Sequence, residues 1–362
     1  MSHIKTMNPI CAFGSDFRES YKADIYKSLT LPQGAILHYR YKFRYVSQEI
    51  LDNPSLFRGD DAVLFFSHIL PRKKPKPFEI PEIERAPDTY KNHSIRWAKI
   101  HKIVKTDDTE LLHVYFRLGD FCDIELDDND AAKQPGKIFF GAVKCKEGAE
   151  NLRKDPRQRL DDENRPGRTT WANRIKELSD YFPKLPFFYI KNIKTKNKIV
   201  EFKYDKHTPS CYYPLAQGTD YVIELAVSNI KETDVKIKIC EETGELIINH
   251  SGDIQTTVQF DDYNIPIFTK PLSTATQSSV LRVNLTKEDK TIPEYETSID
   301  LKLRLSLREP LKFGLFSLLG AGSLLAVAPR TQPFVFNYYL LGASAACFTI
   351  AAGFLFYFFN KK

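Results

Sequence analysis

Hydrophobic and polar residues alternate along much of the chain, and this alternation is typical of strands that bury one face. In the segment AILHYRYKFRYV (residues 35–46), leucine and aromatic side chains occupy one face of the predicted strand. The opposite face is basic and holds His38, Arg40, Lys42 and Arg44. Further strands are predicted at residues 60–69, 95–104 and 110–121. We therefore expect residues 1–145 to form an α+β domain, made mostly of sheet, that senses a ligand or partner.

Two helices are predicted among these strands. Apolar residues at every fourth position predict a helix over residues 17–29. We interpret residues 146–185 as a charged linker that ends in a short amphipathic helix. Thr170 is a suitable N-cap for that helix, and its apolar face holds Trp171, Ile175 and Leu178.

Alternation returns after residue 186 in short segments, which are separated by turn sequences such as EETGE and HSGD. This pattern predicts an antiparallel β-sandwich or barrel over residues 186–310. The last predicted strand is SIDLKLRLSL (residues 298–307), and only a few residues join it to the apolar segment that follows. A short connection has little slack, so we expect movements of the sandwich to reach that segment.

Residues 313–328 and 338–359 form two apolar segments without a single Asp, Glu, Lys, Arg or His. A helix over the second would be about 33 Å long, enough to cross a hydrocarbon core of about 30 Å. A helix over the first would be about 24 Å long, which is also the length of a buried core helix. Its basic flanks and the span that follows favour a second crossing. Residues 311–360 are therefore predicted to form a transmembrane helical hairpin.

The residues around this hairpin predict its orientation and its packing. Lysine and arginine are concentrated before the first segment and after the second, which places both the large N-terminal part and the C-terminus in the cytosol, on a cytoplasmic membrane. Because neither segment holds an ionisable residue, a transporter is disfavoured. Small residues allow close helix packing in lipid, within one hairpin or between copies in a homo-oligomer; they are Gly320, Gly322, Gly342, Ala345, Ala346, Thr349 and Gly353.

Composition and motifs narrow the range of functions. The 52 Lys and Arg residues nearly balance the 46 Asp and Glu residues, and a net charge of +6 does not indicate a dedicated nucleic-acid binder. The six cysteines include no CxxC pair and are expected to be free cytosolic thiols. We find no nucleotide-binding, hydrolase or zinc-protease motif, and therefore predict no enzyme activity, catalytic residue, metal site or cofactor.

One weak enzymatic pattern stays open. Glu201 and Lys203 on a predicted strand, with Asp180 upstream, have the residue types of a metal-dependent nuclease. Any exposed amphipathic strand produces a Glu-x-Lys pair by alternation, however, so we rank this alternative last.

The basic row of residues 38–44 has three interpretations. Residues on one face of a strand are about 6.6–6.8 Å apart, close to the spacing of phosphates in a nucleic-acid strand. The simplest interpretation is a solvated face whose charges are offset by carboxylates on a neighbouring strand. The second is a binding face for an anionic ligand. The third is a surface that contacts lipid.

The arrangement of a cytosolic β-rich part before a hairpin such as LLGASAACFTIAAG resembles that of membrane-disrupting effectors of bacterial anti-phage defence. The resemblance is one of architecture and transfers no residue. It implies a membrane-anchored sensor that oligomerises through its hairpin and perturbs the bilayer when activated. The alternative is a passive membrane scaffold that recruits a soluble partner to the cytosolic face.

Overall fold

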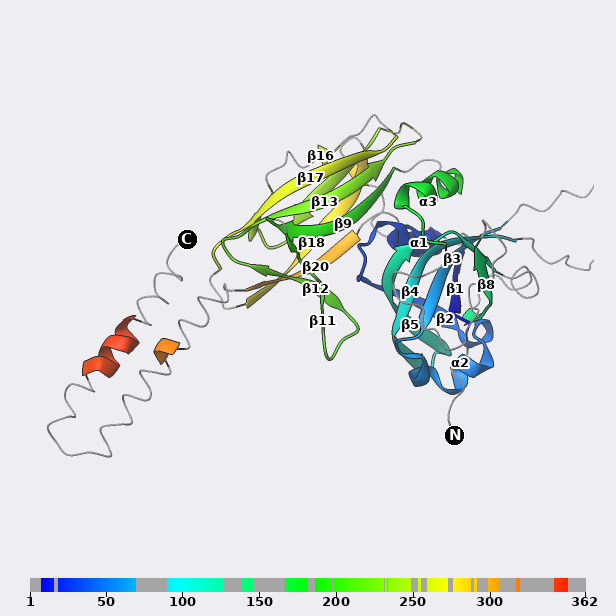
Figure 1. The fold of residues 1–362 in the computed structure, drawn as a ribbon, viewed down its shortest axis with the longest axis horizontal. Coiled ribbons are helices and arrows are strands. Elements are labelled where there is room, and N and C mark those ends of the chain that lie inside the picture. Colours follow the sequence, from blue (N-terminus) through cyan, green and yellow to red (C-terminus); the bar gives the residue numbers. More distant parts are fainter. Residues whose placement is uncertain are drawn as a thin grey trace, which may run out of the picture.

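A computed structural model of the chain (Figure 1) shows a protein built mostly of β-sheet. The residues described are 8–15, 19–69, 90–126, 138–145, 167–181, 186–196, 198–230, 232, 234–248, 253–254, 259–272, 276–287, 290–291, 299–306, 317–319 and 342–350. Residues 70–89 and most of the predicted linker lie outside them.

The N-terminal part contains a six-stranded sheet of order β2-β5-β4-β3-β1-β7. Its strands are β1 (Ile10–Ser15), β2 (Ile36–Lys42), β3 (Asp61–Ile69), β4 (Tyr90–Thr106), β5 (Leu111–Phe121) and β7 (Ile138–Phe140). The strands predicted at 60–69, 95–104 and 110–121 are confirmed. The prediction missed β1, which pairs in parallel with β3 inside the sheet.

Several short elements surround this sheet. Helix α1 (Glu19–Thr30) confirms the predicted first helix, whose residues 17–18 lie outside the described range. The others are α2 (Gln48–Asp52), the 3-10 helices η1 (Phe43–Tyr45) and η2 (Pro54–Phe57), and a two-stranded sheet of β6 (Ile124–Leu126) and β8 (Val143–Cys145). Strands β6 and β8 help to bury a second apolar cluster around Trp97, on the sheet face opposite α1.

The C-terminal part contains two sheets, of five and seven strands, that share one core. The five-stranded sheet, in spatial order, comprises β10 (Lys198–Ile199), β9 (Phe187–Thr195), β13 (Asp220–Ser228), β17 (Asp261–Thr269) and β15 (Leu246–Ile248). The seven-stranded sheet comprises β11 (Lys203–Tyr204), β12 (Cys211–Ala216), β20 (Ile299–Ser306), β18 (Thr276–Lys287), β14 (Val235–Glu241) and β16 (Asp253–Ile254), with β19 (Lys290–Thr291) beside β18.

This arrangement corrects one part of the predicted sandwich. Strand β12 pairs with β20 in parallel, with Tyr213 opposite Leu303, so the sheets are not wholly antiparallel. The inward alternation predicted for the last strand is present, because Ile299, Leu301 and Leu303 in β20 are all buried.

Hydrogen bonds and ring contacts join the N-terminal and C-terminal parts. The hydroxyl of Tyr26 in α1 donates to the carbonyl oxygen of Pro186 at 2.8 Å, and its ring stacks on Phe187. The indole of Trp171 donates to the carbonyl oxygen of Leu29 at 3.1 Å. Residues from both parts therefore belong to a single buried cluster.

Little of the predicted hairpin falls within the described residues. Gly320, Gly322 and Gly353 lie outside them, as do most positions of 313–328 and 338–359. Residues 342–350 are helical and stand clear of the sheets in Figure 1. No helix within the described ranges combines the length and hydropathy needed to cross a bilayer.

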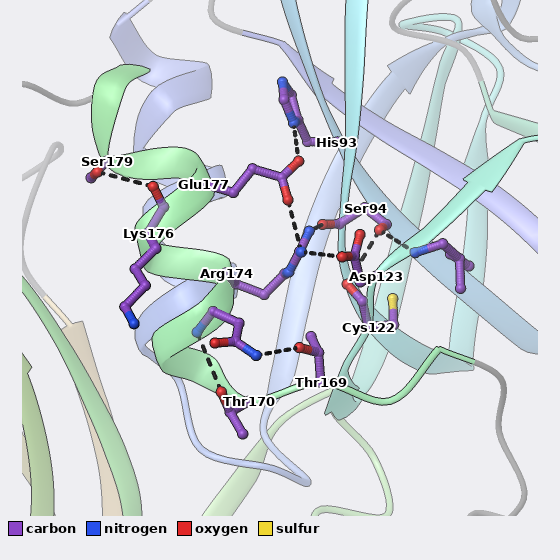
Figure 2. Close-up of polar contacts among 12 residues, drawn as sticks. His93, Ser94, Cys122, Asp123, Thr169, Thr170, Arg174, Lys176, Glu177 and Ser179 are labelled. Carbon is purple, nitrogen blue, oxygen red and sulfur yellow. Dashed lines mark hydrogen bonds and ion pairs between the residues drawn. The ribbon is translucent and has the colours of Figure 1, made fainter. Parts of the chain in front are cut away.

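Helix α3 (Trp171–Leu178) is attached to the N-terminal sheet by ion pairs around the buried side chain of Arg174 (Figure 2). Thr170 caps it as predicted, accepting a hydrogen bond from the Asn173 backbone N–H. From its inner face, Arg174 contacts Asp123 at 2.8 Å and Glu177 at 2.7 Å. The other oxygen of Glu177 lies 2.6 Å from Nδ1 of His93 on β4. The inner face of α3 therefore holds charged contacts in addition to the predicted apolar residues.

We predict that Arg174→Met destabilises the full-length protein by about 2–3 kcal/mol, because Asp123 and Glu177 lose their shared cation. The loss should lie below the roughly 3–5 kcal/mol of a fully buried pair, since both carboxylates are partly exposed. Urea unfolding measures it. The control Lys176→Met, on the exposed side of α3, removes only a surface cation–π contact with Phe260 worth at most about 1 kcal/mol. Equal losses in the two variants would contradict this role of Arg174.

Candidate anion-binding face

The structure places His38, Arg40 and Lys42 on one exposed face of β2, which is an edge strand of the six-stranded sheet. The strand register extends this face across β5 and β4. We define the basic face by four rows of residues: Lys42, Leu111 and Thr106; Arg40, His113 and Val104; His38, Tyr115 and Lys102; and Ile36, Arg117 and Lys99.

None of these twelve positions carries a carboxylate. The residues directly opposite His38 and Arg40 on β5 are Tyr115 and His113, not the acidic partners that the simplest interpretation requires. The first carboxylate across the sheet is that of Asp61 on β3, opposite Lys99. The charges of the face are therefore not neutralised from the neighbouring strand.

Residues of α1 bring both an acidic and a basic group close to the row. Lys27 and Arg40 both lower the pKa of Asp24, but burial dominates and raises it overall. Within the described part of the chain, neither Arg40 nor Lys42 forms a salt bridge. An incoming anion would therefore compete with Asp24 for Arg40, whereas none of the described salt bridges engages Lys42.

Three parallel rings lie among these cations. The ring of His38 stacks on Tyr115, with centroids 4.5 Å apart and planes inclined by 10°. It also stacks on His113 at 5.2 Å, and Nε2 of His38 lies 3.0 Å from Nδ1 of His113, within hydrogen-bonding distance. All three rings are partly exposed. Exposed flat rings beside cations form the combination that single-stranded nucleic-acid sites use for bases and phosphates.

His38 and His101 are held in the neutral form. Burial lowers the pKa of His38 to about 4, and the positive charges of Arg40 and Lys27 act in the same direction. Burial also lowers the pKa of His101 on β4, with Arg58, Arg117 and Lys102 contributing. At neutral pH these two histidines therefore add no charge to that of the lysines and arginines.

The structure corrects the end of the predicted strand. Strand β2 stops at Lys42, and Arg44 lies in the 3-10 helix η1 with its guanidinium 4.8 Å from the ring centroid of Tyr45. Arg44 is therefore not part of the regular row. Tyr45, expected in the buried aromatic row, is 37% exposed, whereas Leu37, Tyr39 and Tyr41 are buried as predicted.

Sequence reasoning identified the row on β2 but missed the rest of the face. The missed residues are His113, Tyr115, Arg117 and Lys102. A signal was present, because His113, Tyr115 and Arg117 alternate with buried residues within ELLHVYFRLGDF. What the sequence does not show is the order β2-β5-β4, which brings the two patterns onto one surface.

The nuclease alternative gains no support from the structure. Glu201 and Lys203 lie at the start of the small β11 hairpin, and Asp180 lies in the 3-10 helix η4 (Ser179–Tyr181) after α3. Among the described residues, no three His, Cys, Asp or Glu side chains converge to hold a metal ion.

Comparisons with known proteins do not place the chain in a family. No protein-family model and no curated protein sequence matches it. Among solved structures, domains 4 and 5 of the S-layer protein SbsC align over 33% of this chain and 55% of theirs, at 7% identity and a TM-score of 0.18. The N-terminal domain of PorA aligns over 32% of this chain and 96% of its own, at 13% identity and a TM-score of 0.19.

We predict that the stability of the protein falls as the pH drops from about 6.5 to about 4. Across this window His38 takes up a proton more readily in the unfolded chain than in the folded one, where its pKa is about 4. Arg40→Gln removes a cation beside His38 and should reduce the slope of unfolding free energy against pH. The control Lys198→Gln removes an exposed cation from β10 and should preserve the slope. An unchanged slope in Arg40→Gln would contradict the coupling.

Proposed function

We propose that this protein is a membrane-anchored cytosolic receptor that binds a single-stranded oligonucleotide on its basic face and perturbs the membrane in response. The observation that carries the ligand class is a face of three adjacent strands on which cations without carboxylates opposite them lie beside stacked, partly exposed rings. The overall charge of the chain is modest, so the argument rests on local charge and not on the net value.

The rings support an oligonucleotide over a simpler anion. Inorganic phosphate or a lipid headgroup would need the cations alone, and would gain nothing from Tyr115 or the two histidines. A base stacked on such a ring gains about 1–3 kcal/mol, irrespective of its sequence. A duplex hides its base faces, so the single strand is the form that can use them.

The membrane part of the proposal is supported by the apolar segments and by the described stretch of the second one. In helix 342–350, Phe348 and Ile350 are 39% and 49% exposed, which is unfavourable in water and favourable in lipid. The hydroxyl of Thr349 donates to the carbonyl oxygen of Ala345 at 2.8 Å, so the helix satisfies this polar group internally.

We predict that Arg40→Gln weakens binding of a short single-stranded oligonucleotide and lowers the slope of log affinity against log salt by about 1. Tyr115→Leu should weaken binding about tenfold, because it removes a stacking surface while leaving every charge in place. Fluorescence anisotropy of a labelled oligonucleotide measures both effects.

The controls separate the sources of affinity. Lys198→Gln removes one charge of the same sign outside the basic face and should preserve both affinity and salt slope. A duplex of the same sequence and vesicles with anionic lipid serve as competitors. Equal binding of duplex and single strand, or full affinity in Tyr115→Leu, would refute an oligonucleotide bound by stacking.

We predict that expression of the active protein depolarises the cell membrane, and that Ala345→Leu abolishes this while the protein stays in the membrane fraction. The larger side chain keeps helices apart at the small-residue stripe. Ala343→Leu, two positions away and on the other side of the helix, is the matched control and should remain active. A voltage-sensitive dye reports the outcome; full depolarisation by Ala345→Leu would count against assembly through this stripe.

A further inference from the structure

The hairpin of β11 and β12 projects from the seven-stranded sheet (Figure 1) and packs against one end of the basic face. The hydroxyl of Tyr204 donates to the carbonyl oxygen of Gly34, just before β2, at 2.8 Å. The backbone N–H of Ile36, in the last row of the basic face, donates to Sγ of Cys211 at 3.4 Å. Tyr204 and Cys211 are opposite each other in the register, so both contacts come from the same face of the hairpin.

Gly34 allows the hairpin to approach this closely. Its φ is +87°, a conformation that residues with a side chain rarely adopt. A Cβ at this position would also lie only 3.3 Å from the ring of Phe202 and 3.3 Å from the hydroxyl of Tyr204. The turn before β2 is therefore shaped for contact with the C-terminal part.

Arg117 belongs both to the basic face and to this junction. Its guanidinium carbon lies 5.0 Å from the centroid of the Tyr204 ring, which is within the range of a cation–π contact. The side chain of Arg117 is exposed, and no ion pair among the described residues includes it. A residue of the C-terminal part therefore contacts a cation of the surface that we propose for the ligand.

A guanidinium can contact an aromatic face and a phosphate at the same time. Its five N–H groups point outward in its own plane, whereas the ring contact uses the flat side of the group. Two of these N–H groups match two oxygens of a phosphate. A long side chain that is already held in place also loses less conformational freedom when it binds a ligand. The contact with Tyr204 therefore favours phosphate binding by Arg117.

We propose that Tyr204 positions Arg117 for a phosphate of the oligonucleotide, so that the C-terminal part completes the binding site on the N-terminal sheet. This inference rests on the proposed function and adds the way in which binding is communicated. Because Tyr204 contacts Arg117 only when the hairpin is docked, docking and ligand binding strengthen each other. Strand β12 of the hairpin pairs with β20, the last described strand before the apolar segments. Ligand binding therefore acts on the strand that leads to them.

The first test compares the affinities of variants by fluorescence anisotropy of a labelled single-stranded oligonucleotide. Tyr204→Leu should weaken binding by about three- to tenfold, because Arg117 loses the contact that holds it. Tyr204→Phe keeps the ring and should restore most of this affinity, although it lacks the hydrogen bond to Gly34. In an Arg117→Gln background, Tyr204→Leu should cause no further loss, because a positioning residue acts only through the group that it positions.

Tyr212→Leu is the matched control. Tyr212 lies opposite Lys203 in the register, on the other face of the same hairpin. It makes a comparable cation–π contact, with the guanidinium of Arg304 at 4.3 Å from its ring centroid. Neither Tyr212 nor Arg304 belongs to the basic face, so this variant should bind the oligonucleotide as the wild type does.

The second test measures the junction in the wild-type protein, so it does not depend on the folding of any variant. Cys211 is only partly exposed, and its Sγ accepts the hydrogen bond from Ile36. Saturating oligonucleotide should slow the alkylation of Cys211 by iodoacetamide several-fold, as followed by mass spectrometry of its peptide. Cys240 on β14, outside the junction, is the internal reference and should react at an unchanged rate.

Three results would overturn this inference alone, because in each of them the wild type still binds the oligonucleotide. They are full affinity in Tyr204→Leu, an equal loss from Tyr204→Leu with and without Arg117→Gln, and unchanged alkylation of Cys211 in the bound protein. If the wild type binds no single-stranded oligonucleotide, the proposed function and this inference are both overturned.

Discussion

A single buried guanidinium holds the junction between the N-terminal and C-terminal parts. Arg96 on β4 is fully buried, and its Nη1 donates to the carbonyl oxygen of Leu31, just after α1, at 2.6 Å. Its Nε and Nη2 both donate to the carbonyl oxygen of Gly119 on β5. The same group lies over the rings of Phe121 and Tyr189, from the N-terminal and C-terminal parts respectively. Because a buried charge must be satisfied, this arrangement has few alternatives.

The contacts of Arg96 have two structural consequences. They fix β5 beside β4, and that order places His113 and Tyr115 next to His38 and Arg40. They also hold Phe121 and Tyr189 edge-on to each other, where the N-terminal part meets the C-terminal part.

The sequence predicted the strongly alternating strands and α3, because an element that buries one face shows a regular period of apolar and polar residues. It missed β12 and β17, which contain Pro214 and Pro266, since proline argues against a strand inside a sheet. The register shows how β17 accommodates its proline. Pro266 lies opposite Val222 of β13. On the other side of β17, pairing with β15 ends at Ile267, so no described residue of β15 lies opposite Pro266, which has no backbone N–H to donate. Strand β1 was missed because six residues without alternation, ICAFGS, give no periodic signal.

The edge position of β2 gives the basic row a second physical effect. A sheet that ends in an unpaired strand is a template onto which a strand from another molecule can add. A second copy that joined this edge side by side would bring Arg40 and Lys42 against their own counterparts on the same face. Such like-charge contact is unfavourable, so the row also disfavours growth of the sheet by the addition of further copies. The composition of this one strand therefore disfavours edge-to-edge association, in addition to the recognition role proposed for it.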